Sequence, residues 1–239
     1  MSVSVSVATV SPVVYPDSDG QPMAENTKQF RWIVTIQGGL DALFASDPNV
    51  FVAGDLLWYP VEGENTIRTA PDAMVVFGRP KGDRGSYQQW LENHIAPQVV
   101  FEVLSPGNRR MEIVRKLGFY EHYGVDECYI YDPDDGDLSG WQRVQGKWRE
   151  IESMSGFISP RLGVRFELAN GELELYRPDG RRFATFVELS QQREAEQRRA
   201  DAEQQRADAE QQRADAEQQR AERLAAQLRA LGVNPSEPS

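Results

Sequence analysis

The sequence predicts an α/β domain followed by one long charged helix, and three observations lead to this prediction. Residues 98–131 have the pattern of a strand, a helix and a second strand, because two short apolar runs flank an amphipathic stretch of helical period. Residues 73–77 form another apolar, β-branched run. The end of the chain contains three successive copies of RADAEQQ, and a period of seven residues indicates a helix. We therefore expect a domain over residues 26–189 and a helix over residues 190–231.

The N-terminal segment lacks the features of a packed element. It begins MSVSVSVATVSPVVYP, with no basic region and no long apolar run, so we expect neither a signal peptide nor a membrane span. Proline, aspartate, serine and glycine follow within a few positions, and these residues favour turns. The sequence predicts a flexible arm over residues 1–25 and a disordered tail over residues 232–239.

A first helix is predicted after this arm. Apolar residues recur there at helical spacing, at Ile33, Ile36, Leu40 and Leu43. Asn26 can cap the helix, and Gln29 can complete a capping arrangement with it. The pair Gly38 and Gly39 argues against one continuous rod, because glycine is a poor helix former.

Residues 51–59 then predict a strand or one arm of a hairpin. Asp55 stands among apolar neighbours in this segment. It is either a turn aspartate beside Gly54 or a third carboxylate of a functional site, and the sequence leaves both interpretations open.

One acidic residue, Glu102, lies in the middle of the apolar strand predicted over residues 98–104. Burying an unpaired carboxylate is costly, so such a residue needs a physical reason. Glu102 must lie at the open end of the strand, meet a cation, bind a metal or carry a proton. The residues alone do not choose among these alternatives.

Other charged residues can be brought to Glu102 by the elements that carry them. Asp72 opens the upstream strand, which places a second carboxylate at a strand entry. Asn108 can cap a helix over about residues 109–123, on which Ile113, Leu117 and Tyr120 form an inward stripe. On the same helix Glu112, Lys116 and Tyr120 are four apart and share a face. Two carboxylates on adjacent strands with a nearby lysine can hold a divalent cation, activate water and stabilise negative charge on a phosphate.

These segments resemble a known family. Asp72 in APDAMVV, Glu102 in VVFEVLSP and Lys116 in EIVRKLGFY, followed by YGVDECYIYDP, are similar to the Uma-type family of restriction-endonuclease-like proteins. That family is a branch of the PD-(D/E)XK nuclease superfamily, and the similarity covers residues from about 27 to 189. The resemblance implies a restriction-endonuclease-like fold, with a mixed central sheet flanked by helices.

The resemblance also implies roles for individual residues. Asp72 and Glu102 would bind Mg²⁺ or Mn²⁺, and Lys116 would position or help to activate the attacking water. The superfamily pattern has a lysine two residues after the acidic residue, where this chain has Leu104. Because alternate residues of a strand point to the same side, a lysine from the next helix can fill the vacant place, and Lys116 matches that relocated position. Asp55 recurs in relatives with the FVAGDLLWYP segment, so Asp55 and Glu112 are candidate additional site residues.

The net charge of −11 restricts how the chain could contact DNA, since affinity for phosphate comes from lysine and arginine. Any contact must therefore be local. Two basic clusters are present, one made of Arg109, Arg110, Arg115 and Lys116 and the other of Arg79, Lys81 and Arg84. Each cluster is either an ordinary solvated face or a surface that steers phosphate. Arg109 and Arg110, beside the predicted site, are the candidate contacts to substrate phosphate.

The few cysteine and histidine residues narrow the chemistry further. Cys128 is the single cysteine and lies in a predicted strand, which favours a core position in a protein of the reducing cytoplasm. His94 and His122 are far apart in sequence, and there is no Cys/His cluster for zinc, so a hard, oxygen-ligated cation is favoured. No phosphate-cradling glycine loop, GxSxG elbow or dinucleotide fingerprint occurs.

The second half of the domain contains several short strand patterns separated by turns. They cover residues 140–143, 147–151, 164–168 and 172–176, and they predict antiparallel hairpins that extend the sheet or form a small flap. Trp141 and Trp148 are expected to be packing residues rather than a base-stacking platform. Residues 78–96 form a polar insertion, whose second half predicts a short helix.

The repeat helix has a poor apolar seam. Its 3-4 spacing alternates alanine with glutamate, except near Leu224, Leu228 and Leu231. We expect an exposed helix with charged pairs such as Glu203 and Arg206, which associates weakly as a coiled coil at its leucine end. A homodimer could form through this helix or through the domain.

Three functions of different classes follow from the sequence. The first is a metal-dependent endonuclease that hydrolyses phosphodiester bonds of DNA. The second is a catalytically silent nucleic-acid-binding or regulatory module of the same fold. The third is an interaction protein that acts through its C-terminal helix.

Overall fold

The computed structural model describes residues 13–106 and 110–231 of the 239-residue chain. Two compact units are present, Met1–Thr185 and Phe186–Ser239. The first unit contains the sheets and helices that position the site, and the second contains the long helix. Asn108, Arg109 and the predicted disordered tail over 232–239 lie outside the described residues.

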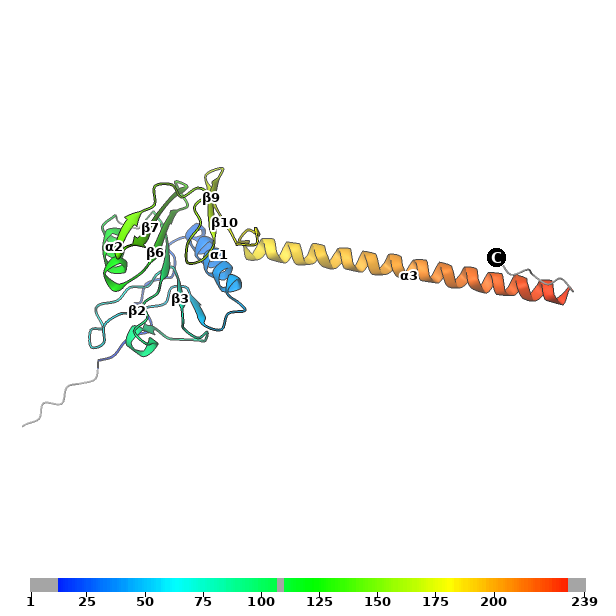
Figure 1. The fold of residues 1–239 in the computed structure, drawn as a ribbon, viewed down its shortest axis with the longest axis horizontal. Coiled ribbons are helices and arrows are strands. Elements are labelled where there is room, and N and C mark those ends of the chain that lie inside the picture. The colour runs from blue at the N-terminus through cyan, green and yellow to red at the C-terminus, as the bar shows by residue number, and fades with distance from the viewer. Residues whose placement is uncertain (1–12, 107–109, 232–239) are drawn as a thin grey trace, which may run out of the picture. The chain divides into compact units, whose positions relative to one another are not determined.

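A mixed six-stranded sheet forms the centre of the first unit (Figure 1), as the sequence predicts. Its strands, in spatial order, are β1 (Val50–Ala53), β3 (Ala73–Phe77), β5 (Val99–Val103), β6 (Glu127–Asp132), β7 (Asp137–Val144) and β8 (Lys147–Glu150). Within this sheet only β5 and β6 pair in parallel, and the other neighbours are antiparallel. A parallel pair needs a crossover, which here is the helix α2 (Arg110–Tyr123).

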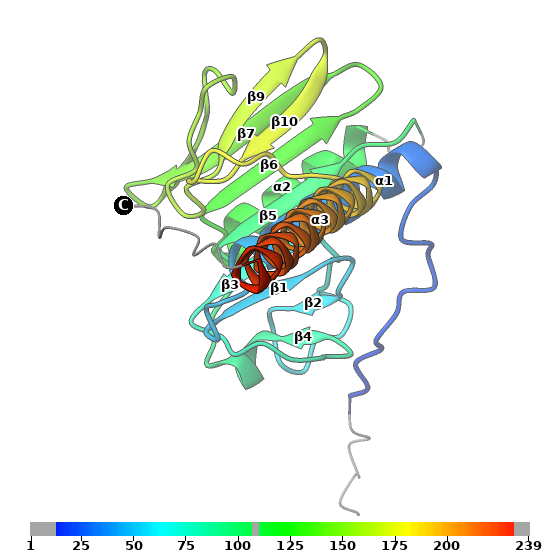
Figure 2. The same ribbon diagram turned by 90° about the vertical axis from the view of Figure 1, so that its right-hand side faces the viewer.

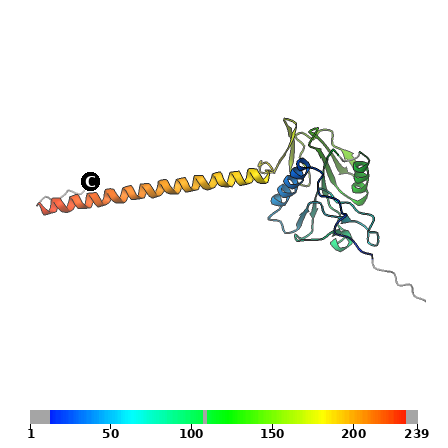
Figure 3. The same ribbon diagram turned by 180° about the vertical axis from the view of Figure 1, so that it is seen from behind.

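Two helices cover opposite faces of the sheet, as Figures 1 and 3 show. Helix α1 (Thr27–Leu43) packs on the face that carries Phe101 and Val103, together with other buried apolar residues. Helix α2 packs on the face that carries Val100, and its predicted inward residue Tyr120 is completely buried there. Successive residues of β5 point to opposite faces, so both faces of this strand are covered.

Smaller elements complete each face. The hairpin of β9 (Arg165–Ala169) and β10 (Glu172–Tyr176) adds buried apolar residues to the cluster around α1 and forms a separate two-stranded sheet (Figure 2). Strand β2 (Trp58–Tyr59) pairs in parallel with β4 (Tyr87–Gln88), which leads into the 3-10 helix η1 (Gln89–Glu92). One predicted hairpin therefore extends the main sheet, as β7 and β8, and the other forms the separate pair of β9 and β10.

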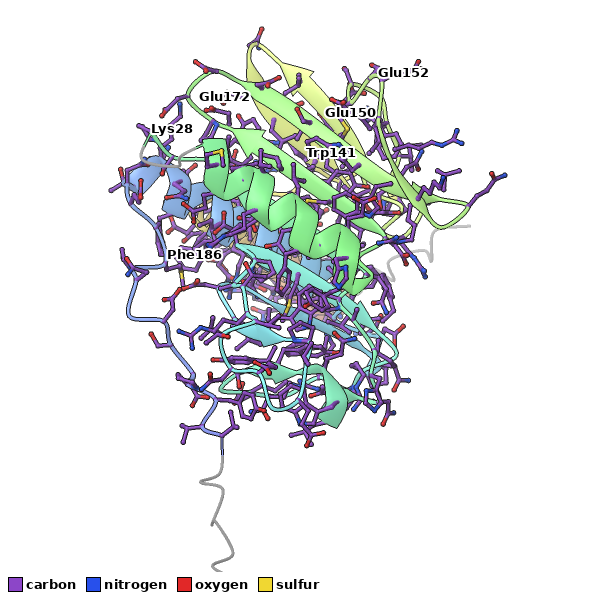
Figure 4. The ribbon with its side chains drawn as sticks, turned by 90° about the vertical axis from the view of Figure 1, so that its left-hand side faces the viewer. Lys28, Trp141, Glu150, Glu152, Glu172 and Phe186 are labelled. Atoms are coloured by element: carbon purple, nitrogen blue, oxygen red, sulfur yellow. The ribbon has the colours of Figure 1, made fainter. Side chains whose placement is uncertain are left out.

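The face beneath α2 holds the residues that the sequence assigned to packing. Figure 4 looks onto this face with α2 in front of the sheet and Trp141 labelled. Trp141 and Trp148 pack against the cluster that contains the buried Cys128. The Nε1–H group of Trp148 donates to the carbonyl of Val125 at 2.8 Å, so its polar atom is used within the fold.

The start of α1 differs in detail from the predicted capping arrangement. The side-chain oxygen of Asn26 accepts from the backbone N–H groups of Lys28 and Gln29, at 3.0 and 2.8 Å. The Gln29 side chain does not return to Asn26. It accepts from the N–H group of Glu25 and donates to the carbonyl of Val103, so it joins the helix start to β5.

The two glycines of α1 do not interrupt the helix, contrary to the expectation from helix propensity alone. Gly38 is exposed and has no neighbour where a Cβ would project. A Cβ on Gly39 would lie 2.1 Å from the ring of Phe183, which is buried against the helix. Tertiary packing therefore requires the absence of a side chain at Gly39 and outweighs its weak helix propensity.

Part of the predicted flexible arm contacts the domain. The ring of Tyr15 meets the rings of Tyr59 and Trp90, with centroids 5.3 and 4.9 Å apart. The carbonyl of Pro16 accepts a hydrogen bond of 2.7 Å from the hydroxyl of Tyr59. Residues 1–12 of the arm lie outside the described residues.

The second unit is dominated by α3 (Phe186–Ala230), which begins four residues before the predicted start of the repeat helix. None of its described residues is buried. Glu194 and Arg198 form a charged pair of the expected kind, four residues apart, with an N–O distance of 3.4 Å. Other pairs join a glutamine to an acidic residue four positions later, as in Gln204 with Asp208 at 2.8 Å. The weak coiled coil and the boundary at residue 190 stay predictions. Among the helices of the described residues, none is long and apolar enough to cross a membrane.

The two adjacent glycines of α1 provide a test of the packing. We expect Gly38→Ala to stabilise the protein by about 0.5–1 kcal/mol, because alanine is the better helix former at an open position. Gly39→Ala should destabilise it by about 1–3 kcal/mol, because the new methyl group overpacks against Phe183. Urea unfolding of both variants measures the difference. Equal effects of the two substitutions would contradict the contact with Phe183.

Candidate active site

The strand register brings Asp72 and Glu102 to one face of the sheet. Strands β3 and β5 are antiparallel, with Ala73 opposite Phe101 and Met74 opposite Val100. Extending this register by one position places Asp72 opposite Glu102, and opposite residues of an antiparallel pair share a face. Met74 and Val100 both face α2, so by alternation the two carboxylates also face α2.

Glu102 is the most enclosed charged residue of this face, with 2% of its surface exposed. Its Oε2 atom accepts a hydrogen bond of 2.8 Å from Nζ of Lys116, and the two groups form an ion pair. Its Oε1 atom accepts a hydrogen bond from the hydroxyl of Tyr120. The structure therefore shows the cation that the buried carboxylate requires, and it comes from the helix face that the sequence identified.

Tyr120 has a role that the sequence only partly indicated. The 3-4 pattern placed it in the buried stripe of α2, and it also shares a face with Lys116. Its pKa is raised well above the usual range, first by burial and then by the charge of Glu102, so the hydroxyl remains a donor. Thr69 also hydrogen-bonds the Tyr120 side chain. Tyr120 thereby fixes one carboxylate oxygen of Glu102.

Lys116 is partly buried and held by several groups. Besides Glu102, its Nζ atom donates to the carbonyl of Ala70 at 3.2 Å. Burial by itself would lower the pKa of the ammonium, but Glu102 and Asp72 outweigh burial, and the resulting pKa is raised. Lys116 is therefore positively charged at neutral pH and acts as a donor rather than as a base.

Asp72 is also buried, with 8% of its surface exposed. Its Oδ2 atom accepts from the backbone N–H group of Val103 at 2.6 Å, which ties the entry of β3 to the end of β5. Its pKa is raised well above the usual range, mainly by burial and next by the charge of Glu102, while Lys116 and the hydrogen bond lower it. The two carboxylates are thus close enough to oppose each other's ionisation.

Asp55 lies at the edge of this group. It is an exposed residue of a bend between β1 and β2, with a φ of +48°, and its backbone N–H group donates to the carbonyl of Pro71, just before Asp72. Its pKa is raised by desolvation and by Asp19, while Lys116 lowers it and Glu102 raises it. The turn interpretation is therefore correct, and Asp55 is also electrostatically coupled to the site. A functional role for it stays a prediction.

The remaining candidates on α2 are less closely placed. Glu112 is exposed and acts on Lys116 only through its charge. Arg109 lies outside the described residues, and Arg110 opens α2 with a side chain that is also outside them. Their predicted contacts with substrate phosphate stay predictions.

The second basic cluster is paired with carboxylates within the fold. Both Arg79 and Arg84 bind the carboxylate of Glu92, with N–O distances of 2.6 and 2.7 Å. Lys81 lies 3.4 Å from a carboxylate oxygen of Asp41. These ion pairs support the interpretation of this cluster as ordinary surface structure rather than a surface that steers phosphate.

Comparison with known proteins identifies the family of the chain. The model of the Uma2 family, described as "Putative restriction endonuclease", matches residues 21–164. The chain belongs to the Uma2 family. This confirms the resemblance found in the sequence, and the mixed sheet flanked by helices confirms the predicted fold class.

A solved structure is also similar to the chain. It is described as a "putative nuclease belonging to DUF820" from Anabaena variabilis, with 15% sequence identity and a TM-score of 0.43. The similarity covers 60% of this chain and 78% of that one. A search of curated proteins gave no match.

The donor set of this Uma2 chain fits a hard divalent cation. Among the described residues, no group of three or more His, Cys, Asp or Glu side chains is placed to hold a metal. Asp72 and Glu102 are two carboxylates on one face, and Mg²⁺ is commonly bound by one or two carboxylates with waters and substrate phosphates. Burial and, after it, the charge of Glu102 raise the pKa of Asp72, and a cation beside the two carboxylates would oppose both effects. It would have to compete with Lys116 for Glu102.

The raised pKa of Asp72 gives a prediction about pH. Because the folded state holds this proton more tightly than the unfolded chain, ionisation of Asp72 costs stability as the pH rises above about 4. Asp72→Asn removes that cost and keeps an oxygen for the N–H group of Val103. As the pH rises, the free energy of unfolding of the variant should therefore increase relative to that of the wild type, by about 1.4 kcal/mol for each unit by which the pKa of Asp72 is raised.

Urea unfolding between pH 4 and pH 8 in the presence of a chelator measures this difference. The variant Asp83→Asn makes the same change of net charge at an exposed position and serves as the control. A difference between Asp72→Asn and the wild type that stays constant with pH would contradict the raised pKa.

Proposed function

We propose that this chain is a metal-dependent endonuclease that hydrolyses phosphodiester bonds of DNA. The arrangement of Asp72, Glu102 and Lys116 on one face supports the proposal. A structural strand has little reason to carry a carboxylate at Glu102, since an apolar residue in its place would avoid the desolvation of two charges. Membership of a family of restriction-endonuclease-like proteins points to the same chemistry.

In this proposal Asp72 and Glu102 hold Mg²⁺ or Mn²⁺. When bound, the cation supplies positive charge that polarises a phosphodiester and makes water a better nucleophile. Lys116 contributes fixed donors and positive charge beside the carboxylates, so it orients the attacking water or stabilises charge that develops on the phosphate. Tyr120 positions Glu102 by donating to its other oxygen.

A catalytically silent module of the same fold is the second candidate. The observation that favours it is the pairing of Glu102, because Lys116 and Tyr120 together engage both of its oxygens. The same pairing would stabilise a strand-to-helix contact with no substrate. Under this alternative the chain would bind nucleic acid or a partner and would not cleave DNA.

Metal-dependent nicking of plasmid DNA tests the proposed activity. We expect the wild type to nick supercoiled plasmid in Mg²⁺ or Mn²⁺ and to stop when a chelator is added. Asp72→Asn and Lys116→Met should each lower the rate by about a hundredfold or more, because each removes charge from the reacting centre.

Asp83→Asn, at an exposed position, should keep the wild-type rate. Nicking that is equally fast in Asp72→Asn would show that the activity arises elsewhere. A wild type that is inactive with both metals would favour the silent module.

A further inference from the structure

A pocket opens beside Lys116 on the surface of the first unit. One side is formed by residues 66–69, and the other by Arg115, Lys116, Phe119 and Tyr123 of α2. Lys116 is thus shared between this pocket and the ion pair with Glu102. Whatever occupies the pocket lies next to the proposed catalytic group.

The charge of the pocket is opposite to that of the chain. Arg68, Arg115 and Lys116 line it, no carboxylate does, and the whole chain has a net charge of −11. No ion pair joins Arg68 or Arg115 to a carboxylate in the part of the chain that the structure describes. By contrast, Arg79 and Arg84 share an ion pair with the carboxylate of Glu92. A local group of cations in an acidic protein favours an anionic ligand.

Arg68 is held in place before any ligand arrives. Its Nη1 atom donates to the hydroxyl of Tyr59 at 3.2 Å, and its guanidinium carbon lies 5.9 Å from the centre of that ring. The same hydroxyl donates to the carbonyl of Pro16, so Tyr59 is fixed as well. A guanidinium with a restricted side chain loses less entropy when it binds phosphate.

The pocket also has an aromatic wall. The rings of Phe119 and Tyr123 lie 4.6 Å apart at 53°, and both residues are partly exposed. Phe119 packs edge-on against the completely buried ring of Trp58, with centroids 5.3 Å apart. A rigid aromatic surface beside a cluster of cations matches the two parts of a nucleotide, the base and the phosphate.

We propose that this pocket holds one unpaired nucleotide of the substrate strand. Arg68 and Arg115 bind its phosphate, and its base lies against Phe119 and Tyr123. A base in a duplex has both faces covered by neighbouring bases, so contact with these rings requires an unstacked base. The substrate would then be single-stranded DNA or a duplex with a locally unpaired segment, which negative supercoiling of a plasmid also favours. This assignment rests on the proposed function for its substrate, but binding alone tests it.

The test uses the full chain in a chelating buffer, so that nothing is cleaved. Fluorescence anisotropy measures binding of a short labelled single-stranded oligonucleotide and of the blunt duplex of the same sequence. We expect the single strand to bind more tightly. Arg68→Gln and Arg115→Gln should each weaken its binding by about tenfold and lower the slope of log K against log salt by about one.

Two further variants separate the parts of the pocket. Tyr123→Leu should weaken the binding of the single strand by about tenfold and leave the binding of the duplex unchanged, because only an unpaired base contacts the ring. Arg31→Gln removes the same charge from an exposed position of α1, on the other face of the sheet, and should change nothing. Thermal melts of Tyr123→Leu confirm that it is folded, and Arg115→Gln, at an exposed position, tests the pocket independently.

The inference is overturned if the wild type does not bind the single strand, or if it binds the duplex as tightly. It is also overturned if Arg115→Gln behaves as Arg31→Gln does. Inorganic phosphate can be added as a competitor of the single strand. If the same phosphate concentration displaces the single strand from the wild type and from Tyr123→Leu, the contact with the base is contradicted. If the single strand binds through the pocket but no DNA is nicked, the proposed nuclease activity is wrong and the pocket assignment holds. If DNA is nicked at the wild-type rate by all of these variants, the nuclease activity holds and the pocket assignment is wrong.

Discussion

The buried ion pair of Glu102 and Lys116 joins the three parts of the site. Glu102 lies inside β5, Lys116 lies on α2, and the lysine also donates to the carbonyl of Ala70, just before Asp72. Leaving either charge without its partner in the interior would be costly, so α2 must dock in the position that brings Lys116 to Glu102. The same docking buries Tyr120 against the second oxygen. One electrostatic requirement thus fixes the register of helix on sheet.

The central part of this arrangement could be predicted from the sequence because it depends on local patterns. An acidic residue in an apolar strand requires a partner, and helical spacing from Glu112 placed Lys116 and Tyr120 on one face. Asp72 follows from its place at the start of a strand, although its contact with Val103 required the register of β3 against β5. The fold class followed from the strand, helix and strand pattern and from the family segments.

Tertiary contacts could not be predicted from local sequence patterns. The continuity of α1 through Gly39 depends on Phe183, more than a hundred residues later. Even within the insertion over residues 78–96, periodicity did not show that the chain folds back and brings Glu92 to both Arg79 and Arg84. Arg68 carried no pattern at all, because it belongs to a connecting segment and becomes part of a cationic pocket only when α2 lies beside it. Such features arise from tertiary contacts, which periodicity does not encode.

Under the proposed function, a divalent cation replaces Lys116 as the partner of Glu102, and thermal melts with and without Mg²⁺ detect this exchange. Glu102→Gln should lower stability without metal, because it leaves the ammonium of Lys116 without its carboxylate. The decisive quantity is therefore the response to metal. We expect Mg²⁺ at about a hundred times its Kd to stabilise the wild type by about 2.7 kcal/mol and to have no effect on Glu102→Gln. If Mg²⁺ and Mn²⁺ leave both proteins unchanged, the ion pair is structural and the account of a metal-dependent site is wrong.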